Sequence, residues 1–143
     1  MTKLMKFTIG LFFAFALIVG SITTPAFAGD ADPLFVNLTT DDAHRATMAI
    51  AFGKSQLERG HPLTIWLTDK GVLVGSKSNA INLVNQQKML AELIGKGAVV
   101  LICPFCLEHY GVNKADLLPG IKLGNPELTG SALFKGNTKS LTW

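Results

Sequence analysis

Cysteine is scarce in this sequence, and several motifs that identify a function directly are absent. The 143 residues include 2 cysteines, too few for the disulfide scaffold of a small secreted protein. No glycine-rich phosphate-binding fingerprint follows a predicted strand, which argues against a nucleotide-binding fold. The sequence also contains no internal repeat, no low-complexity tract and no sign of a second domain. It predicts no organic cofactor.

An excess of charge of one sign is absent as well. Lysine and arginine number 13 and aspartate and glutamate 10, for a net charge of +3. Lys3 and Lys6 lie in a segment that we expect to be removed, and without them the net charge is about +1. A nearly neutral chain without a basic stripe gives no case for nucleic acid or an anionic membrane as partner.

The N-terminal segment predicts export. A short basic start precedes an almost wholly apolar run over residues 7–19, and residues 26–28 place small side chains at the two positions that a signal peptidase reads. The apolar run is shorter than the roughly 20 residues of a membrane span. We therefore interpret residues 1–28 as a secretory signal peptide that is cut after Ala28. The mature chain, residues 29–143, is expected to be one periplasmic or secreted domain that is not in the membrane.

Apolar runs alternate with helical patterns along the mature chain. Strands are predicted at 34–38, 63–67, 98–102, 121–123 and 141–143. Helical spacing predicts helices over 43–59 and 81–96, a helical turn over 107–110 and a weak helix over 130–135, with a loop over 69–79. The run at 98–102 is the most continuous and predicts a central strand buried on both faces. The alternation predicts a single small α/β domain with a mainly parallel five-stranded sheet flanked by helices.

The two cysteines form the motif Cys103-Pro104-Phe105-Cys106 directly after this apolar run. Functional groups of open parallel sheets gather at the carboxyl ends of strands. If a helical turn begins after Cys103, free backbone N–H groups stabilise its thiolate, and Pro104 suits the first helical position. Cys106 is then placed to attack a mixed disulfide or persulfide on Cys103. The motif predicts sulfur exchange, with Cys103 and Cys106 as the candidate catalytic residues.

Other interpretations of the motif remain open. A thioredoxin-like oxidoreductase fits the spacing, but its motif follows an early strand and opens a long helix. Attachment of c-type haem requires a histidine where Leu107 stands. A zinc or copper site would use Cys103, Cys106 and His109, with a fourth ligand such as His44 or His61. The cysteines are otherwise small core residues of a structural or assembly protein.

Polar residues follow the first predicted strand at the same expected edge of the sheet. Asp41, Asp42 and His44 would share a rim with Cys103 in a parallel sheet. Capping of the following helix by Asp41 or Asp42 is the simpler interpretation. We expect Trp66 and Trp143 to be core or interface residues.

Several segments in order resemble the DsrE/DsrF-like family of small α/β proteins. Residues 35–42 resemble the opening strand and loop of that family, and the helix that ends before Gly60 resembles its first helix. The strongest stretch is residues 97–106, followed by Tyr110-Gly111-Val112, because many members have a cysteine ending the third strand and a glycine eight residues later. Residues 116–121 resemble the next family segment.

The resemblance implies a compact α/β fold that assembles as trimers or hexamers. In sulfur-relay members the strand-ending cysteine carries sulfur as a persulfide and passes it on, a role that maps onto Cys103. Cys106 matches a second cysteine present in a subset of members. The partners implied are a protein or a small thiol that donates or accepts sulfur. Whether the protein is an enzyme or only a carrier is left open by the resemblance.

Overall fold

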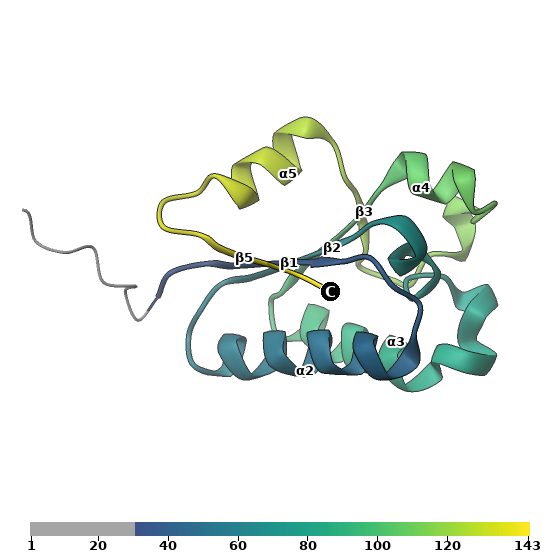
Figure 1. Cartoon of the computed structure of the whole chain (residues 1–143), viewed down its shortest axis with the longest axis horizontal. Helices are drawn as coiled ribbons and strands as arrows, with labels where there is room; N and C mark the ends of the chain where they lie inside the picture. The colour runs from purple at the N-terminus through teal and green to yellow at the C-terminus, as the bar shows by residue number, and fades with distance from the viewer. Residues whose placement is uncertain (1–30) are drawn as a thin grey trace, which may run out of the picture.

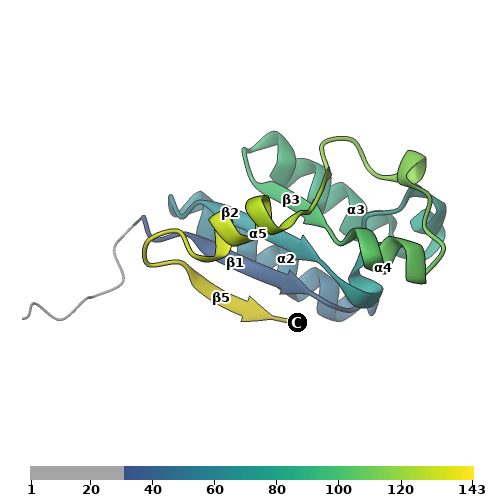
Figure 2. The same ribbon diagram turned by 90° about the horizontal axis from the view of Figure 1, so that it is seen from above.

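A computed structural model describes residues 31–143 of the chain (Figures 1 and 2). The predicted export signal over residues 1–28 lies outside these residues. Within residues 31–143, no helix is both long enough and apolar enough to cross a membrane.

A five-stranded parallel sheet organises the fold, with the strand order β4-β3-β2-β1-β5. Its strands are β1 (Leu34–Leu38), β2 (Leu63–Leu67), β3 (Val99–Ile102), β4 (Lys122–Leu123) and β5 (Lys139–Thr142). The predicted single α/β domain with a parallel five-stranded sheet is confirmed. The central strand is β2, however, and β3 lies between β2 and the short edge strand β4.

Helices cover the two faces of the sheet unequally. The long helices α2 and α3 lie along one face, α5 lies over the other, and α4 follows the C-terminal end of β3 (Figures 1 and 2). The α-helices are α2 (Ala43–Glu58), α3 (Ala80–Gly95), α4 (Pro104–His109) and α5 (Pro126–Leu133). Three short 3₁₀ helices complete the described chain: η1 (Asp69–Leu73), η2 (Lys77–Asn79) and η3 (Lys114–Asp116).

Strand residues alternate between these two faces, as the two-residue period of a strand requires. Val36, Leu38, Ile65 and Leu67 are fully buried in the main hydrophobic core with α2 and α3. The side chain of Trp66 belongs to the opposite face, where it lines cavities beside α5. The hydrophobic core therefore lies on the α2–α3 side, and the α5 side of the sheet remains partly open.

Several predicted boundaries differ from the structure because capping residues and tertiary burial decide them. The predicted loop over 69–79 contains η1 and η2, with Val72 and Val74 fully buried. Helix α5 begins at Pro126, because the Asn125 Oδ1 atom accepts the Leu128 N–H at 2.7 Å and Pro126 suits the first turn. Strand β5 covers 139–142, where 141–143 was predicted.

Candidate functional site

Cys103 lies between the end of β3 and the start of α4. Its backbone is extended, its N–H donates to the Leu67 carbonyl oxygen at 3.0 Å, and its side chain is the N-cap of α4. The Sγ atom accepts the Cys106 N–H at 3.3 Å, and Pro104 occupies the first turn. The helix thus begins immediately after Cys103, earlier than the helical turn predicted at 107–110. The sulfur thus accepts one of the backbone N–H groups that have no partner within the first turn of the helix.

Cys106 lies in the first turn of α4 and is half-buried. Its Sγ accepts the backbone N–H of Asp69 at 3.2 Å. Burial raises the pKa of the Cys106 thiol, the hydrogen bond with Cys103 raises it further, and the Asp69 N–H opposes both effects. Cys106 is consequently a neutral thiol near pH 7.

Asp69, at the start of η1, joins the cysteine motif to the neighbouring strand β2. The register of the β2–β3 pair places Leu67 opposite Ile102. The residues that follow these two strands are therefore close in space. Asp69 has a φ of 48°, a left-handed conformation that aspartate tolerates better than most residues. This turn directs its N–H at Cys106, while its carboxylate accepts a hydrogen bond from the Tyr110 hydroxyl.

Asp69 and Tyr110 were not among the predicted site residues. Both hydrogen bonds join segments distant in sequence, since Asp69 is separated from Cys106 by 37 positions and from Tyr110 by 41. One signal was present: Asp69 follows a strand that would pair with the strand before Cys103 in a parallel sheet. The site therefore comprises Cys103, Cys106, Asp69 and Tyr110.

Asp69→Asn is expected to lower the titration midpoint of Tyr110 from about 12 toward its ordinary value. The hydrogen bond to Asp69 raises the pKa of Tyr110 to about 12, because the phenolate would lose that bond and face a carboxylate. Tyr110 is the single tyrosine, so the phenolate absorbance of the whole protein reports it alone. Asparagine also tolerates the left-handed backbone. Circular dichroism at each pH checks that the chain is folded.

The matched control for this titration is Asp116→Asn, which removes a carboxylate in η3 that hydrogen-bonds Ser78. It should leave the Tyr110 midpoint near 12. Equal midpoints in the wild type and Asp69→Asn would contradict the Asp69–Tyr110 hydrogen bond.

The other candidate ligands are not gathered at the motif. Within residues 31–143, no group of three or more His, Cys, Asp or Glu side chains is arranged to hold a metal ion. The exposed His109 ring packs edge-on against Tyr110, with 4.7 Å between ring centroids. His61 precedes β2, at the opposite end of that strand from Asp69, and its Nδ1 bonds the Asp32 carbonyl oxygen at 2.8 Å. His44 is exposed in the first turn of α2.

One of the acidic residues after β1 caps a helix, and the two tryptophans lie on different sides of the sheet. Asp42 Oδ1 accepts the Arg45 N–H at 2.8 Å, so capping of α2 is confirmed. Trp143 packs against the core and contacts Phe52, with ring centroids 5.8 Å apart. Trp66 lies outside the main hydrophobic core, and its half-buried ring lines two cavities beside α5.

The chain belongs to the DsrE/DsrF-like family, which it matches over residues 34–135, more than half of its length. It is 35% identical over 80 residues to the uncharacterized protein MJ0989 of Methanocaldococcus jannaschii, a match that covers 55% of this chain and 70% of that protein. This membership supports a thiol or sulfur-relay function at the level of the family.

Two solved structures share the fold at low sequence identity. The ychN protein from E. coli superposes with a TM-score of 0.62 at 14% identity, covering 79% of this chain and 99% of that one. The protein of unknown function MTH1491 from Methanobacterium thermoautotrophicum gives a TM-score of 0.61 at 16% identity, covering 77% and 99%. At such identities the likeness shows the fold alone.

Proposed function

We propose that this protein is a periplasmic or secreted sulfur carrier in which Cys103 holds a persulfide. One observation carries the proposal: the Cys103 sulfur caps α4 at the C-terminal edge of the sheet and accepts the Cys106 N–H at 3.3 Å. The reacting form in this proposal is the Cys103 thiolate, because a thiolate and not a thiol attacks another sulfur. Family membership supports the same class of chemistry.

Loading is a transfer of one neutral sulfur atom. The Cys103 thiolate attacks the outer sulfur of a persulfide or polysulfide, R–S–SH. The new S–S bond forms at Cys103, the donor S–S bond breaks, and R–S⁻ leaves with the bonding electron pair. The product is Cys103–S–SH. Unloading is the same step in reverse, in which an acceptor thiolate takes the outer sulfur and Cys103 returns as a thiolate.

Cys106 has a supporting role in this scheme. As a neutral thiol hydrogen-bonded to the Asp69 N–H, it is a poor nucleophile near pH 7 and leaves the neighbouring persulfide intact. When it ionises, attack on the inner sulfur of Cys103 forms a Cys103–Cys106 disulfide and expels HS⁻. A dithiol reductant is then needed to restore both thiols. Cys106 thus sets how long the sulfur is retained.

The expected partners follow from the same chemistry and from the family. We propose a protein or small thiol as sulfur donor and acceptor, and self-association of the chain as a trimer or hexamer. The residues described in the structure offer no assembled metal-ligand group that would favour the alternative of zinc or copper binding.

Cys103→Ser is expected to lower sulfur loading at least about tenfold, because the attacking sulfur is removed. Reduced protein is incubated with inorganic polysulfide at neutral pH without oxygen. Mass spectrometry of the intact chain and of its peptides then counts and locates the added sulfur, which should be on Cys103.

Cys106→Ser is the matched control and should load like the wild type. Loading of Cys103→Ser at the wild-type level, or sulfur found on Cys106 alone, would contradict the proposal. Failure of every form to load would favour a structural or assembly protein.

A further inference from the structure

A cavity of about 300 Å³ opens beside Cys103 on the α5 side of the sheet. Cys103, Phe105, Trp66, Gly124, Pro126 and Thr129 are among the residues that line it, whereas Cys106 is not. Cys106 instead contacts Asp69, at the start of η1. The cavity therefore lies against only one of the two cysteines, the one that we propose to carry sulfur.

The walls of this cavity are held by backbone contacts. A Cβ atom at Gly124 would lie 2.2 Å from the Trp66 ring, so the indole lies directly against the bare backbone there. The Gly124 N–H donates to the Ile102 carbonyl oxygen at 2.8 Å, which ties the segment before α5 to the end of β3. Helix α5 then begins, with Asn125 as its N-cap and Pro126 in its first turn. The indole is consequently part of a preformed wall.

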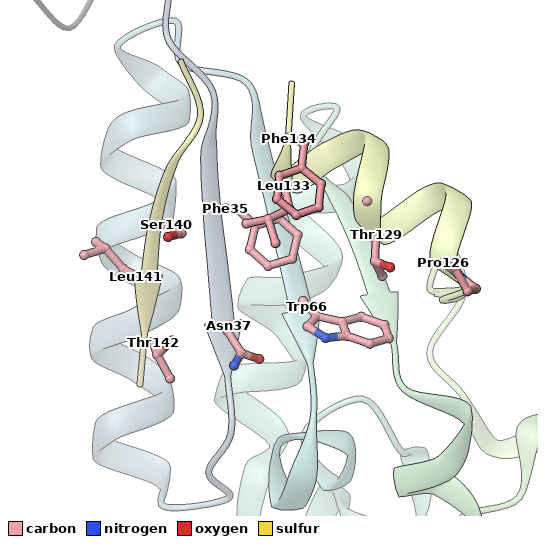
Figure 3. A pocket seen from close by; sticks show the side chains of 11 residues that line it. Phe35, Asn37, Trp66, Pro126, Thr129, Leu133, Phe134, Ser140, Leu141 and Thr142 are labelled. Atoms are coloured by element: carbon pink, nitrogen blue, oxygen red, sulfur yellow. The ribbon is translucent and has the colours of Figure 1, made fainter. Parts of the chain in front are cut away.

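A second cavity of about 520 Å³ continues along α5 and shares three residues with the first. Figure 3 shows these residues, Trp66, Pro126 and Thr129, with the indole lying between the sheet and α5. Among residues 31–143, no charged side chain lines either cavity, and exposed Phe105 and Phe134 contribute to them. Apolar and aromatic walls with a few uncharged polar groups are typical of small-molecule sites.

We propose that the cavity beside Cys103 binds the carbon portion of a small, uncharged, apolar thiol or persulfide, with the ligand sulfur at Cys103. The inference deepens the proposed function and rests on it. An aromatic or aliphatic group gains contact with Trp66 and Phe105 and loses little hydration. A carboxylate-bearing thiol would meet no lining cation and would bring negative charge to the Cys103 thiolate. The uncharged lining therefore favours an uncharged ligand over an anionic one.

The test uses methanethiosulfonate reagents on the Cys106→Ser protein. The Cys103 thiolate attacks the reagent R–S–SO₂CH₃, a disulfide Cys103–S–S–R forms, and methanesulfinate leaves with the electron pair. R is benzyl, sulfonatoethyl or trimethylammonioethyl. Each rate is divided by the rate of the same reagent with free 2-mercaptoethanol, an uncharged thiol, which removes differences in intrinsic reactivity. The normalised benzyl rate is expected to exceed both charged ones on the order of tenfold.

Two substitutions on α5 test whether the lining of the cavity causes the preference for the benzyl reagent. Thr129→Glu puts a charge into the lining and is expected to remove most of the benzyl preference. Ser131→Glu adds the same charge at an exposed position of the same helix that lines neither cavity, and it should keep the preference. Circular dichroism of both variants checks folding. Equal normalised rates for the three reagents in the parent, or equal effects of the two substitutions, would overturn the proposal.

Polysulfide loading of the same proteins separates this inference from the proposed function. Inorganic polysulfide has no carbon group, so loading of Cys103 does not require the cavity. Loading without a benzyl preference overturns the cavity proposal alone. In the opposite outcome, Thr129→Glu removes the benzyl preference but the protein never loads sulfur. That result overturns the carrier function and supports an apolar ligand site at Cys103.

Discussion

Raising the pH from about 7 to about 9 is expected to accelerate sulfide release from the persulfidated protein by roughly a hundredfold, because the Cys106 thiolate fraction grows about tenfold per pH unit below its pKa. Burial and the hydrogen bond with Cys103 hold the pKa of Cys106 above its ordinary value. A raised thiol pKa keeps Cys106 protonated through the neutral range. Its attack on the persulfide is therefore slow near neutrality and fast at alkaline pH.

The measurement follows hydrogen sulfide released from protein loaded with one sulfur atom per chain. Each release consumes the Cys106 thiolate, forms the Cys103–Cys106 disulfide and expels HS⁻, so sulfide and disulfide should appear in equal amounts. Cys106→Ser is the matched control, since serine keeps the size of the side chain but cannot form the disulfide. Its sulfide release should lack the steep rise with pH.

A pH profile that is unchanged in Cys106→Ser would show that Cys106 does not resolve the persulfide. Rapid sulfide release from the wild type near pH 7 would contradict the role of Cys106 as a neutral thiol that leaves the cargo intact. The experiment therefore distinguishes a sulfur carrier, which retains its cargo near neutrality, from a thiol-redox protein, which discharges it.

Gly71→Ala is expected to lower the free energy of unfolding by about 3 kcal/mol, the upper part of the usual range for overpacking. A Cβ atom at Gly71 would lie 2.0 Å from the Leu38 carbonyl oxygen, a backbone atom at the end of β1. Relief of this clash requires η1 to move away from the sheet. Since Asp69 begins η1, the Asp69 N–H would then shift from the Cys106 sulfur.

Chemical denaturation followed by circular dichroism measures this effect, and Gly95→Ala is its matched control. Gly95 is exposed at the end of α3, and a Cβ atom there would meet nothing within 4 Å. Alanine is the better helix former, so this variant should be stabilised by about 0.5 kcal/mol. Equal effects of the two substitutions would contradict the close approach of η1 to β1.

Local patterns in the sequence were sufficient for the class of fold. Continuous apolar runs predicted β1, β2 and β3 closely, because parallel strands with helices packed on both faces of the sheet carry few polar residues. The capping role of Asp42 was also predictable, since an N-cap depends on residues within one helical turn. The weaker elements were less well predicted: α5 begins four residues before its predicted start at 130, where Asn125 and Pro126 provide its cap and first turn.

For the candidate site as well, the features that the sequence predicts are those whose residues lie close together in the chain. Placement of Cys103 at the end of β3 and of Cys106 one turn later follows from the motif and the apolar run before it. Tertiary structure alone decided that Asp69 reaches Cys106 and Tyr110, that β2 is the central strand, and that Trp66 and α5 form a cavity beside Cys103. Strand order and the docking of α5 arise from contacts between distant segments, which no local periodicity encodes.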